Sequence, residues 1–287
     1  MTTTRRSNFA ATLRTTVLLA SLTGLLVVIG ALIGGPQIAL IFLGIALLLN
    51  LGMYWFSDRI ALAMARAKPI EESEAPRLFQ MVRELTTRAS LPMPRLYMIP
   101  QDQPNAFATG RSPKHAAVAV TRGITRLLSE DELRGVLAHE LAHVRNRDIL
   151  ITSVASAIGG AITYLGYMLL WFGGEDDESP LGLVASLALV ILAPIAAAII
   201  QLAISRQREY SADATGAAIS GNPESLASAL LRLEEGAKAI PMQVNQSSEP
   251  LYIVKPFAGG GLAALFSTHP PIEERVRRLR QMRPALV

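Results

Sequence analysis

The stretch Ser129–Val144 reads S-E-D-E-L-R-G-V-L-A-H-E-L-A-H-V and contains the pattern H-E-x-x-H. Ser129 and Glu132 are spaced as a capping box, in which each side chain bonds the backbone N–H of the other residue. Acidic residues fill the first turn and good helix formers follow, as is typical of a helix start. The stretch therefore predicts a helix that begins after Ser129 and carries the H-E-x-x-H pattern in its second half.

The two histidines of this pattern, His139 and His143, are four positions apart and so lie on one face of the predicted helix. Both imidazoles can then bind one metal ion. Glu140 lies about 100° around the helix from His139, close enough to act on a water at the metal without being a ligand. The alternative is a pair of surface histidines on an amphipathic helix. The capping box and a candidate third ligand downstream favour the metal site.

The composition indicates a membrane protein. Hydrophobic residues make up 51% of the 287 residues and charged residues 17%, whereas about 25% of a typical soluble domain is charged. The chain has no cysteine, so any metal must be bound by histidines and carboxylates. The net charge is +4, but the basic residues flank apolar segments instead of forming a cluster, so we expect no nucleic-acid partner.

Four uncharged apolar segments are each long enough to cross a bilayer; they cover about residues 15–33, 38–56, 150–172 and 181–204. They divide the chain into a membrane hairpin (1–56), a region with the H-E-x-x-H helix (57–149), a second hairpin (150–204) and a last region (205–287). Lysine and arginine lie at the outer ends of both hairpins and are missing from the two short connecting loops. The positive-inside rule then places both termini and both non-membrane regions in the cytoplasm.

These segments have two alternative interpretations. The first segment could be a secretory signal peptide, although no clear small-x-small cleavage site follows it. The second pair could be a buried apolar hairpin of a soluble fold, but its 23 and 24 uncharged residues are long enough to span a membrane.

A zinc site for hydrolysis needs three protein ligands and one open position. Glu209 and Asp213, in the sequence E-Y-S-A-D, lie on one face of a predicted helix just after the fourth apolar segment. Because the third and fourth segments form a hairpin, this helix starts near Asp148, where the first metal-binding helix ends. Glu209 can then be the third ligand, and Asp213 can orient a ligand histidine through a hydrogen bond. The alternative for Glu209 is an exposed glutamate paired with a nearby arginine.

The remaining patterns predict an α+β membrane protein that is mostly helical and has a small β-sheet. Short strands are predicted at Arg95–Ile99, Asn105–Thr109 and Ala116–Thr121. Helices are predicted at Glu71–Ser90, at Ser205–Ile219, from Pro223 to about Lys238 and from Pro270 to Met282. The sequence G-G-P-Q at 34–37 predicts a tight turn between the first two apolar segments.

Three motifs, together with the four apolar segments, resemble the HtpX family of heat-shock-linked bacterial membrane metalloproteases: H-E-L-A-H at 139–143, E-Y-S-A-D at 209–213 and S-T-H-P-P-I-E-E-R at 267–275. N-A-F-A at 105–108 also matches that family and is similar to the substrate-strand motif of the wider gluzincins. The resemblance covers nearly the whole chain. It implies a gluzincin-like zinc endopeptidase of the inner membrane that removes damaged or misfolded membrane proteins without ATP.

Carried onto matching positions, the resemblance implies one Zn²⁺ bound by His139, His143 and Glu209, with Glu140 as the general base. Asp213 would hold a ligand histidine, Asn105 would bond the substrate backbone, and His269 would stabilise the oxyanion. His269 has an alternative role as a loop or helix-cap histidine. His115 is expected in a surface turn, and Asn146 and Asp148 as caps at the membrane surface.

The implied partners are unfolded protein substrates and the lipid bilayer. One rival interpretation is a processing enzyme of the prenyl-protein protease type, which trims defined peptide ends. The other is a scaffold with a structural metal site. A structural site closes its fourth position with a protein ligand, which only His115 or His269 could supply as a histidine, and it needs no base such as Glu140.

Overall fold

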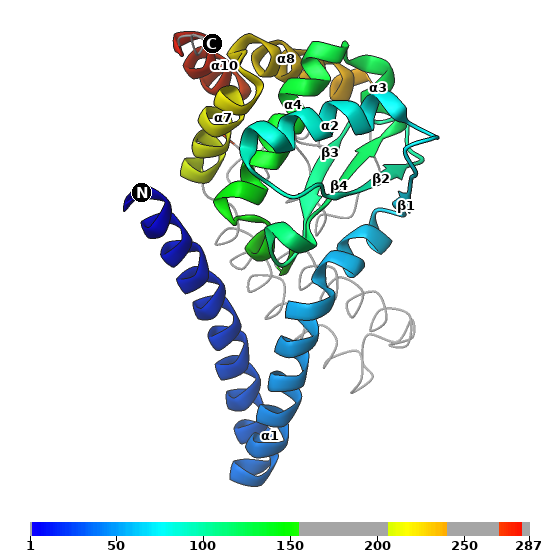
Figure 1. Cartoon of the computed structure of the whole chain (residues 1–287). Coiled ribbons are helices and arrows are strands. Elements are labelled where there is room, and N and C mark those ends of the chain that lie inside the picture. Colours follow the sequence, from blue (N-terminus) through cyan, green and yellow to red (C-terminus); the bar gives the residue numbers. More distant parts are fainter. Residues whose placement is uncertain (1, 155–205, 240–269, 283–287) are drawn as a thin grey trace.

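The first helix of the protein folds back on itself. A computed structural model describes residues 2–154, 206–239 and 270–282 (Figure 1). Helix α1 (Thr2–Met64) contains Pro36 and reverses at Gly35, where φ is +69°. The Asn50 amide donates to Thr23 Oγ1 at 2.7 Å, although 27 residues of straight helix would span about 40 Å. The predicted turn at 34–37 is therefore where the two arms of α1 meet.

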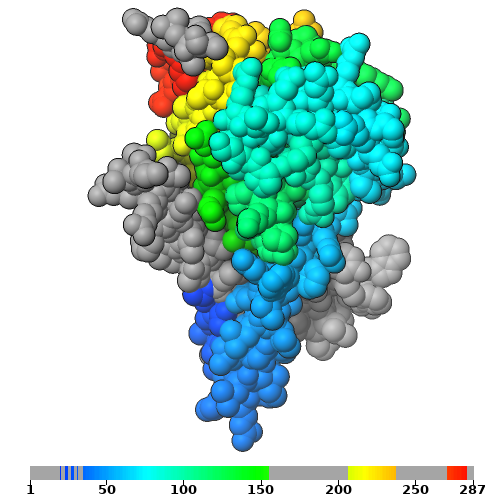
Figure 2. Space-filling model, in the orientation of Figure 1, coloured from blue at the N-terminus to red at the C-terminus, as the bar shows by residue number. Residues whose placement is uncertain are grey.

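The second arm of α1 is apolar, and most of it is not buried. Gly35–Met64 is the segment of the described residues that is long and apolar enough to cross a membrane, and 6% of its most apolar window is buried. Figure 2 shows this arm projecting from the body of the molecule. It contains the second predicted segment, 38–56, and continues to Met64 because Ala61 and Leu62 pack against the sheet.

The other three predicted membrane segments have no comparable support. The first lies in the earlier arm of α1. The third and fourth lie outside the described residues, except for a helical start at 149–154. Four membrane helices therefore stay a prediction.

A four-stranded mixed sheet follows α1. Its strands are β1 (Lys68–Pro69), β2 (Arg95–Ile99), β3 (Ala106–Thr109) and β4 (Ala117–Thr121), in the order β1-β2-β4-β3. β2 and β4 are parallel, and the other two pairs are antiparallel. The three predicted strands are confirmed to within one residue. β1 has only two residues and ends in proline, which is too short for an alternating pattern.

Alternate residues of the strands serve two different cores, because successive side chains of a strand point to opposite faces. Leu96 and Val118 lie in the larger core, which the helices cover. Phe107 and Ala119 lie in a smaller core, which the end of α1 covers with Ala61. The sheet is thus held between the helical layer and the end of the apolar arm of α1.

The helical layer consists of α2 (Pro76–Ala89), α3 (Arg122–Leu127), α4 (Glu130–Asn146), α7 (Arg206–Ser220), α8 (Pro223–Ala239) and α10 (Ile272–Gln281). α4 contacts α2, β3, α7 and α8, and so lies at the centre of the layer (Figure 1). The helix predicted from Glu71 begins later, at Pro76, because the Glu71 N–H bonds the Glu74 carboxylate in a preceding turn. α3 was not predicted; Thr121 caps it by accepting from the Ile124 N–H.

Candidate metal centre

The H-E-x-x-H stretch is helical, as predicted, and both of its ends are well defined. The Ser129 hydroxyl accepts from the Glu132 N–H at 3.3 Å, and the Glu132 carboxylate accepts from the Ser129 N–H at 2.8 Å. The helix ends at Arg147, whose φ of +61° is left-handed. Within α4, the Nε2 atoms of His139 and His143 lie 3.2 Å apart. One helix therefore presents two imidazole nitrogens to the same point.

Glu209 of α7 completes the cluster. Its Oε2 lies 3.7 Å from His139 Nε2, and its Oε1 lies 3.5 Å from His143 Nε2. The three donor atoms lie within 4.8 Å of one another, and in the described part of the chain this is the group that could hold a metal ion. Ligands about 2.0–2.1 Å from a tetrahedral ion lie about 3.3 Å from each other, close to these separations. The donor set of two histidines and one glutamate therefore fits a zinc-type site.

The close packing of α7 on α4 depends on glycine. A Cβ atom at Gly216 would lie 2.9 Å from the backbone N and Cα of His139. The neighbouring contact residue Ala212 is fully buried. α7 can approach α4 at this distance because Gly216 has no side chain, and this approach brings Glu209 to the histidines.

Each histidine has a carboxylate at its second ring nitrogen. His139 Nδ1 lies 3.0 Å from Asp213 Oδ1. His143 Nδ1 lies 3.4 Å from Asp148 Oδ2. Such contacts fix the ring orientation of a metal ligand. The sequence predicted only a capping role for Asp148. The left-handed conformation of Arg147 turns the chain back toward α4, so that the Asp148 carboxylate reaches His143.

The electrostatics of the cluster favour a bound cation. Glu140, Glu209 and Asp213 are at most 7% exposed. Burial raises the pKa of Glu140, with Glu209 adding to the effect. Burial alone would lower the pKa of His143, but the hydrogen bond to Asp148 and the charges of Glu209 and Glu140 raise it to about 9. The carboxylates thus stabilise a positive charge at the histidines, which a metal ion can supply instead of a proton.

Arg275 of α10 is a site residue that the sequence analysis missed. Its side chain is completely buried. Its Nε and Nη2 donate to the two carboxylate oxygens of Asp213 at 2.9 and 2.7 Å, and its Nη1 lies 3.7 Å from Glu209 Oε2. Burial would raise the pKa of Asp213, but Arg275 and His139 lower it to about 2. In the sequence, Arg275 was marked only as the last residue of the family motif at 267–275, and the resemblance implied no role for it.

Glu140 faces the sheet edge. Its Oε2 accepts from the Ala108 N–H of β3 at 2.8 Å. β3 is the edge strand beside β4, so this N–H points away from the sheet toward the cluster. The base candidate and the candidate substrate strand therefore adjoin each other.

Asn105 is buried beside β3, His115 is exposed, and neither belongs to the cluster of His139, His143 and Glu209. Asn105 directly precedes β3 and is 3% exposed. Its backbone N–H donates to Thr121 Oγ1, and its carbonyl accepts from the Thr121 N–H, both at 2.9 Å. His115 is exposed in the short 3-10 helix η1 (Pro113–His115), as expected. His269 lies outside the described residues.

Comparisons with known proteins agree on one family. Residues 72–283 match peptidase family M48. A protease HtpX homolog of Syntrophobacter fumaroxidans is 55% identical over 94% of this chain and 98% of its own length. One from Burkholderia thailandensis is 52% identical over 94% and 96%. A crystal structure of S. mikatae Ste24p has a TM-score of 0.52 at 19% identity, over 96% of this chain and 66% of that chain, and supports the fold alone.

Proposed function

The chain belongs to peptidase family M48 and is a metalloprotease that hydrolyses peptide bonds, and we propose that it is a zinc-dependent endopeptidase acting on damaged or misfolded membrane proteins at the membrane surface. The observation that carries this proposal is the convergence of His139, His143 and Glu209 beside the buried Glu140. Protein quality control is the role that the similarity to protease HtpX homologs supports.

In this proposal, His139, His143 and Glu209 hold one zinc ion, which when bound supplies the Lewis acidity that activates water and polarises the scissile carbonyl. Glu140 is the general base. Its raised pKa suits it to accept a proton from the attacking water and to return it to the leaving nitrogen. Asp213 and Asp148 hold the two imidazoles by their Nδ1 atoms, and Arg275 holds Asp213.

The substrate would lie extended along β3. An edge strand offers unpaired backbone groups to which a peptide can add as a further strand. The Ala108 N–H on this edge already bonds Glu140, so a peptide paired with β3 would pass beside the base. We assign Asn105, at the start of this edge, to a hydrogen bond with the substrate backbone, and His269 to the oxyanion.

We further propose that the protein crosses the membrane as two helical hairpins, 1–56 and 150–204. The regions 57–149 and 205–287 then join on the cytoplasmic side. The apolar arm Gly35–Met64 supports one of these crossings, and the distribution of basic residues supports the orientation. A catalytic site at this surface would act on membrane-attached or partly extracted segments. The alternative, a processing enzyme of the prenyl-protein protease type, would require a defined peptide end.

Removal and return of the metal tests the proposed function. Chelation of the full-length protein in detergent should reduce cleavage of an unfolded protein by at least about 100-fold, and stoichiometric zinc should restore it. A short prenylated peptide, assayed in parallel, tests the alternative. Undiminished cleavage after complete metal removal would contradict the proposal, and cleavage of the prenylated peptide alone would favour the processing enzyme.

Replacing Asn105 with alanine should lower kcat/KM for peptide cleavage by about 3–10-fold, because one hydrogen bond to the substrate is lost. The bound metal should not change, since Asn105 is not in the cluster. Gln103→Ala is the matched control, because Gln103 is also buried and precedes β3 in the same segment. Equal rates for Asn105→Ala and the wild type would remove Asn105 from the substrate site.

A further inference from the structure

A separate pocket lies where the end of α1 meets the start of β2 and the β3–β4 connection. Its volume is about 340 Å³. The lining that matters here consists of Trp55, Asp58 and Arg59 of α1, Arg95 of β2, and Arg111 and Lys114 of the connection. None of the candidate metal ligands lines it. The pocket is thus separate from the candidate metal centre, and the hydrolytic chemistry does not account for it.

The pocket has an excess of positive charge. Its lining contains four arginine and lysine side chains, the His115 imidazole and one carboxylate, that of Asp58. Asp58 is 7% exposed, and its Oδ2 accepts from Arg95 Nη2 at 2.7 Å. Its charge is therefore already balanced by Arg95. For Arg59, Arg111 and Lys114, no ion pair with a carboxylate occurs among the described residues. The charges of these three groups are therefore not balanced by carboxylates in the described part of the chain, and Arg59 also lies 5.6 Å from the centre of the Phe56 ring.

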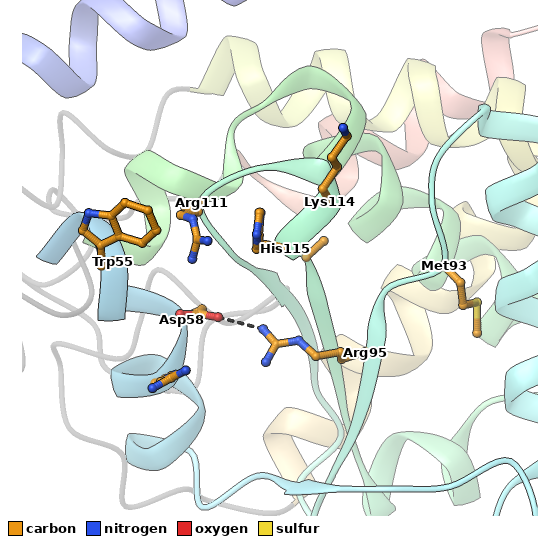
Figure 3. A pocket seen from close by; sticks show the side chains of 9 residues that line it. Trp55, Asp58, Met93, Arg95, Arg111, Lys114 and His115 are labelled. Atoms are coloured by element: carbon orange, nitrogen blue, oxygen red, sulfur yellow. Dashed lines mark hydrogen bonds and ion pairs between the residues drawn. The ribbon is translucent and has the colours of Figure 1, made fainter. Parts of the chain in front are cut away.

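Two contacts hold Arg111 and Arg95 in position before any ligand arrives. The Arg111 guanidinium lies 4.4 Å from the centre of the Trp55 ring, a cation–π contact that ties the β3–β4 connection to α1. The Asp58–Arg95 pair ties β2 to the same helix. Figure 3 shows Trp55 beside Arg111 on one side of the open space and the Asp58–Arg95 pair on another. A preorganised site loses less side-chain entropy on binding.

The position of the pocket on α1 indicates the source of the anion. Tyr54, Trp55 and Phe56 are 38–49% exposed near the end of the apolar arm. Tyrosine and tryptophan are enriched where a membrane helix meets water, at the level of the lipid headgroups. Arg59 lies one turn further along the same helix. At this level the abundant anions are lipid phosphates.

We propose that this pocket binds the phosphodiester headgroup of an anionic phospholipid, an inference that rests on the membrane placement of α1 proposed above. Arginine guanidinium groups match phosphate oxygens in pairs, and basic pockets beside membrane helices bind anionic headgroups. The bound lipid would fix the protease region against the bilayer, because the pocket is shared between α1 and the sheet.

Quenching of Trp55 fluorescence by a brominated lipid tests this assignment. The chain has two tryptophans, so Trp171→Phe leaves Trp55 as the only one. The full-length protein in detergent micelles is titrated with brominated phosphatidylglycerol or brominated phosphatidylcholine. Removing two cationic groups in Arg111→Gln/Lys114→Gln should weaken binding of phosphatidylglycerol by about 25-fold, at about fivefold for each group.

The control variant loses the same two charges elsewhere. Arg77→Gln/Arg126→Gln removes exposed arginines that pair with Glu130 and Asp102, away from the pocket, and it should bind as the wild type does. Thermal unfolding reports whether each variant is folded. Arg59→Gln, at an exposed position of α1, is the second variant, and about a fivefold loss is expected for it.

Equal binding of the two lipids, or equal affinity of the pocket variant and the control variant for phosphatidylglycerol, would overturn the assignment. It would also be overturned if free glycerol phosphate displaced the lipid at a concentration as low as that at which the lipid itself binds. If an acidic peptide bound this pocket and phosphatidylglycerol did not, the pocket would be a binding site for the substrate instead. Cleavage of an unfolded protein by the wild type in detergent is measured separately. A protease that cleaves but does not bind phosphatidylglycerol would contradict this inference and leave the proposed function intact.

Discussion

Replacing Glu140 with glutamine is expected to lower kcat/KM for peptide cleavage by about 10²–10⁴-fold while the bound metal is retained. The glutamine amide can still accept a hydrogen bond from the Ala108 N–H, which Glu140 accepts at 2.8 Å. It cannot accept a proton from water, which is the step that the proposal assigns to Glu140. Metal content and cleavage of an unfolded protein, measured on the same purified sample, separate these two effects.

Glu130→Gln is the matched control for this prediction. Glu130 lies in the first turn of α4, and its side chain is 67% exposed, so the same chemical change is made on the same helix away from the cluster. We expect wild-type cleavage from it. If Glu140→Gln cleaved as fast as Glu130→Gln, the hydrolytic base would have to be another residue. If Glu140→Gln lost the metal, Glu140 would have a role in holding the cluster.

Replacing Arg275 with methionine is expected to destabilise the protein by about 3–5 kcal/mol, because Asp213 would be left buried without the cation that neutralises it. Asp213 would also lose the two hydrogen bonds that fix its orientation toward His139. Loss of such an outer partner typically weakens metal binding by about 10–100-fold. Thermal unfolding in detergent and competition with a chelator measure the two effects.

Two further variants decide why Arg275 matters. Arg277→Met changes the same residue type on the same helix, where the side chain is 67% exposed, and should have little effect. Arg275→Met/Asp213→Leu removes both buried charges, so it should recover much of the lost stability. Metal affinity should stay low in this double variant, since His139 lacks its acceptor. Recovery of full metal affinity would show that Asp213 does not position the ligand.

The parts of the site that were predictable depend on spacing within one element. His139, Glu140 and His143 lie within one turn of a capped helix, so helix geometry alone relates their positions. Three of the four strands were predictable because each is a short apolar or β-branched run between turn residues, whereas the two-residue β1 has no such pattern. The prediction of Glu209 as a third ligand required one further assumption, that the apolar segments between α4 and Glu209 form a hairpin and return the chain to the end of α4. That segment lies outside the described residues, and the packing of α7 on α4 supports the result independently.

The residues that were missed act through contacts between elements. Asp148 reaches His143 because Arg147 adopts a left-handed conformation, which the sequence does not signal at an arginine. Arg275 enters the site because α10 packs on α7 and α8. On its own helix it is one of four arginines, and its neighbours Arg277, Arg278 and Arg280 form exposed ion pairs. Sequence spacing cannot distinguish the buried arginine from the exposed ones.

Local periodicity, capping and composition were enough to predict the H-E-x-x-H helix, histidines and carboxylates as the candidate metal ligands, three of the four strands and the apolar arm. The packing of the elements was needed to show which carboxylate lies beside each histidine, that Arg275 is buried against Asp213, and that four arginine and lysine residues from three separate segments share one pocket with Trp55. The physical reason is that burial and charge pairing are set by how elements pack, and a chain pattern specifies the faces of an element but not what is placed against them.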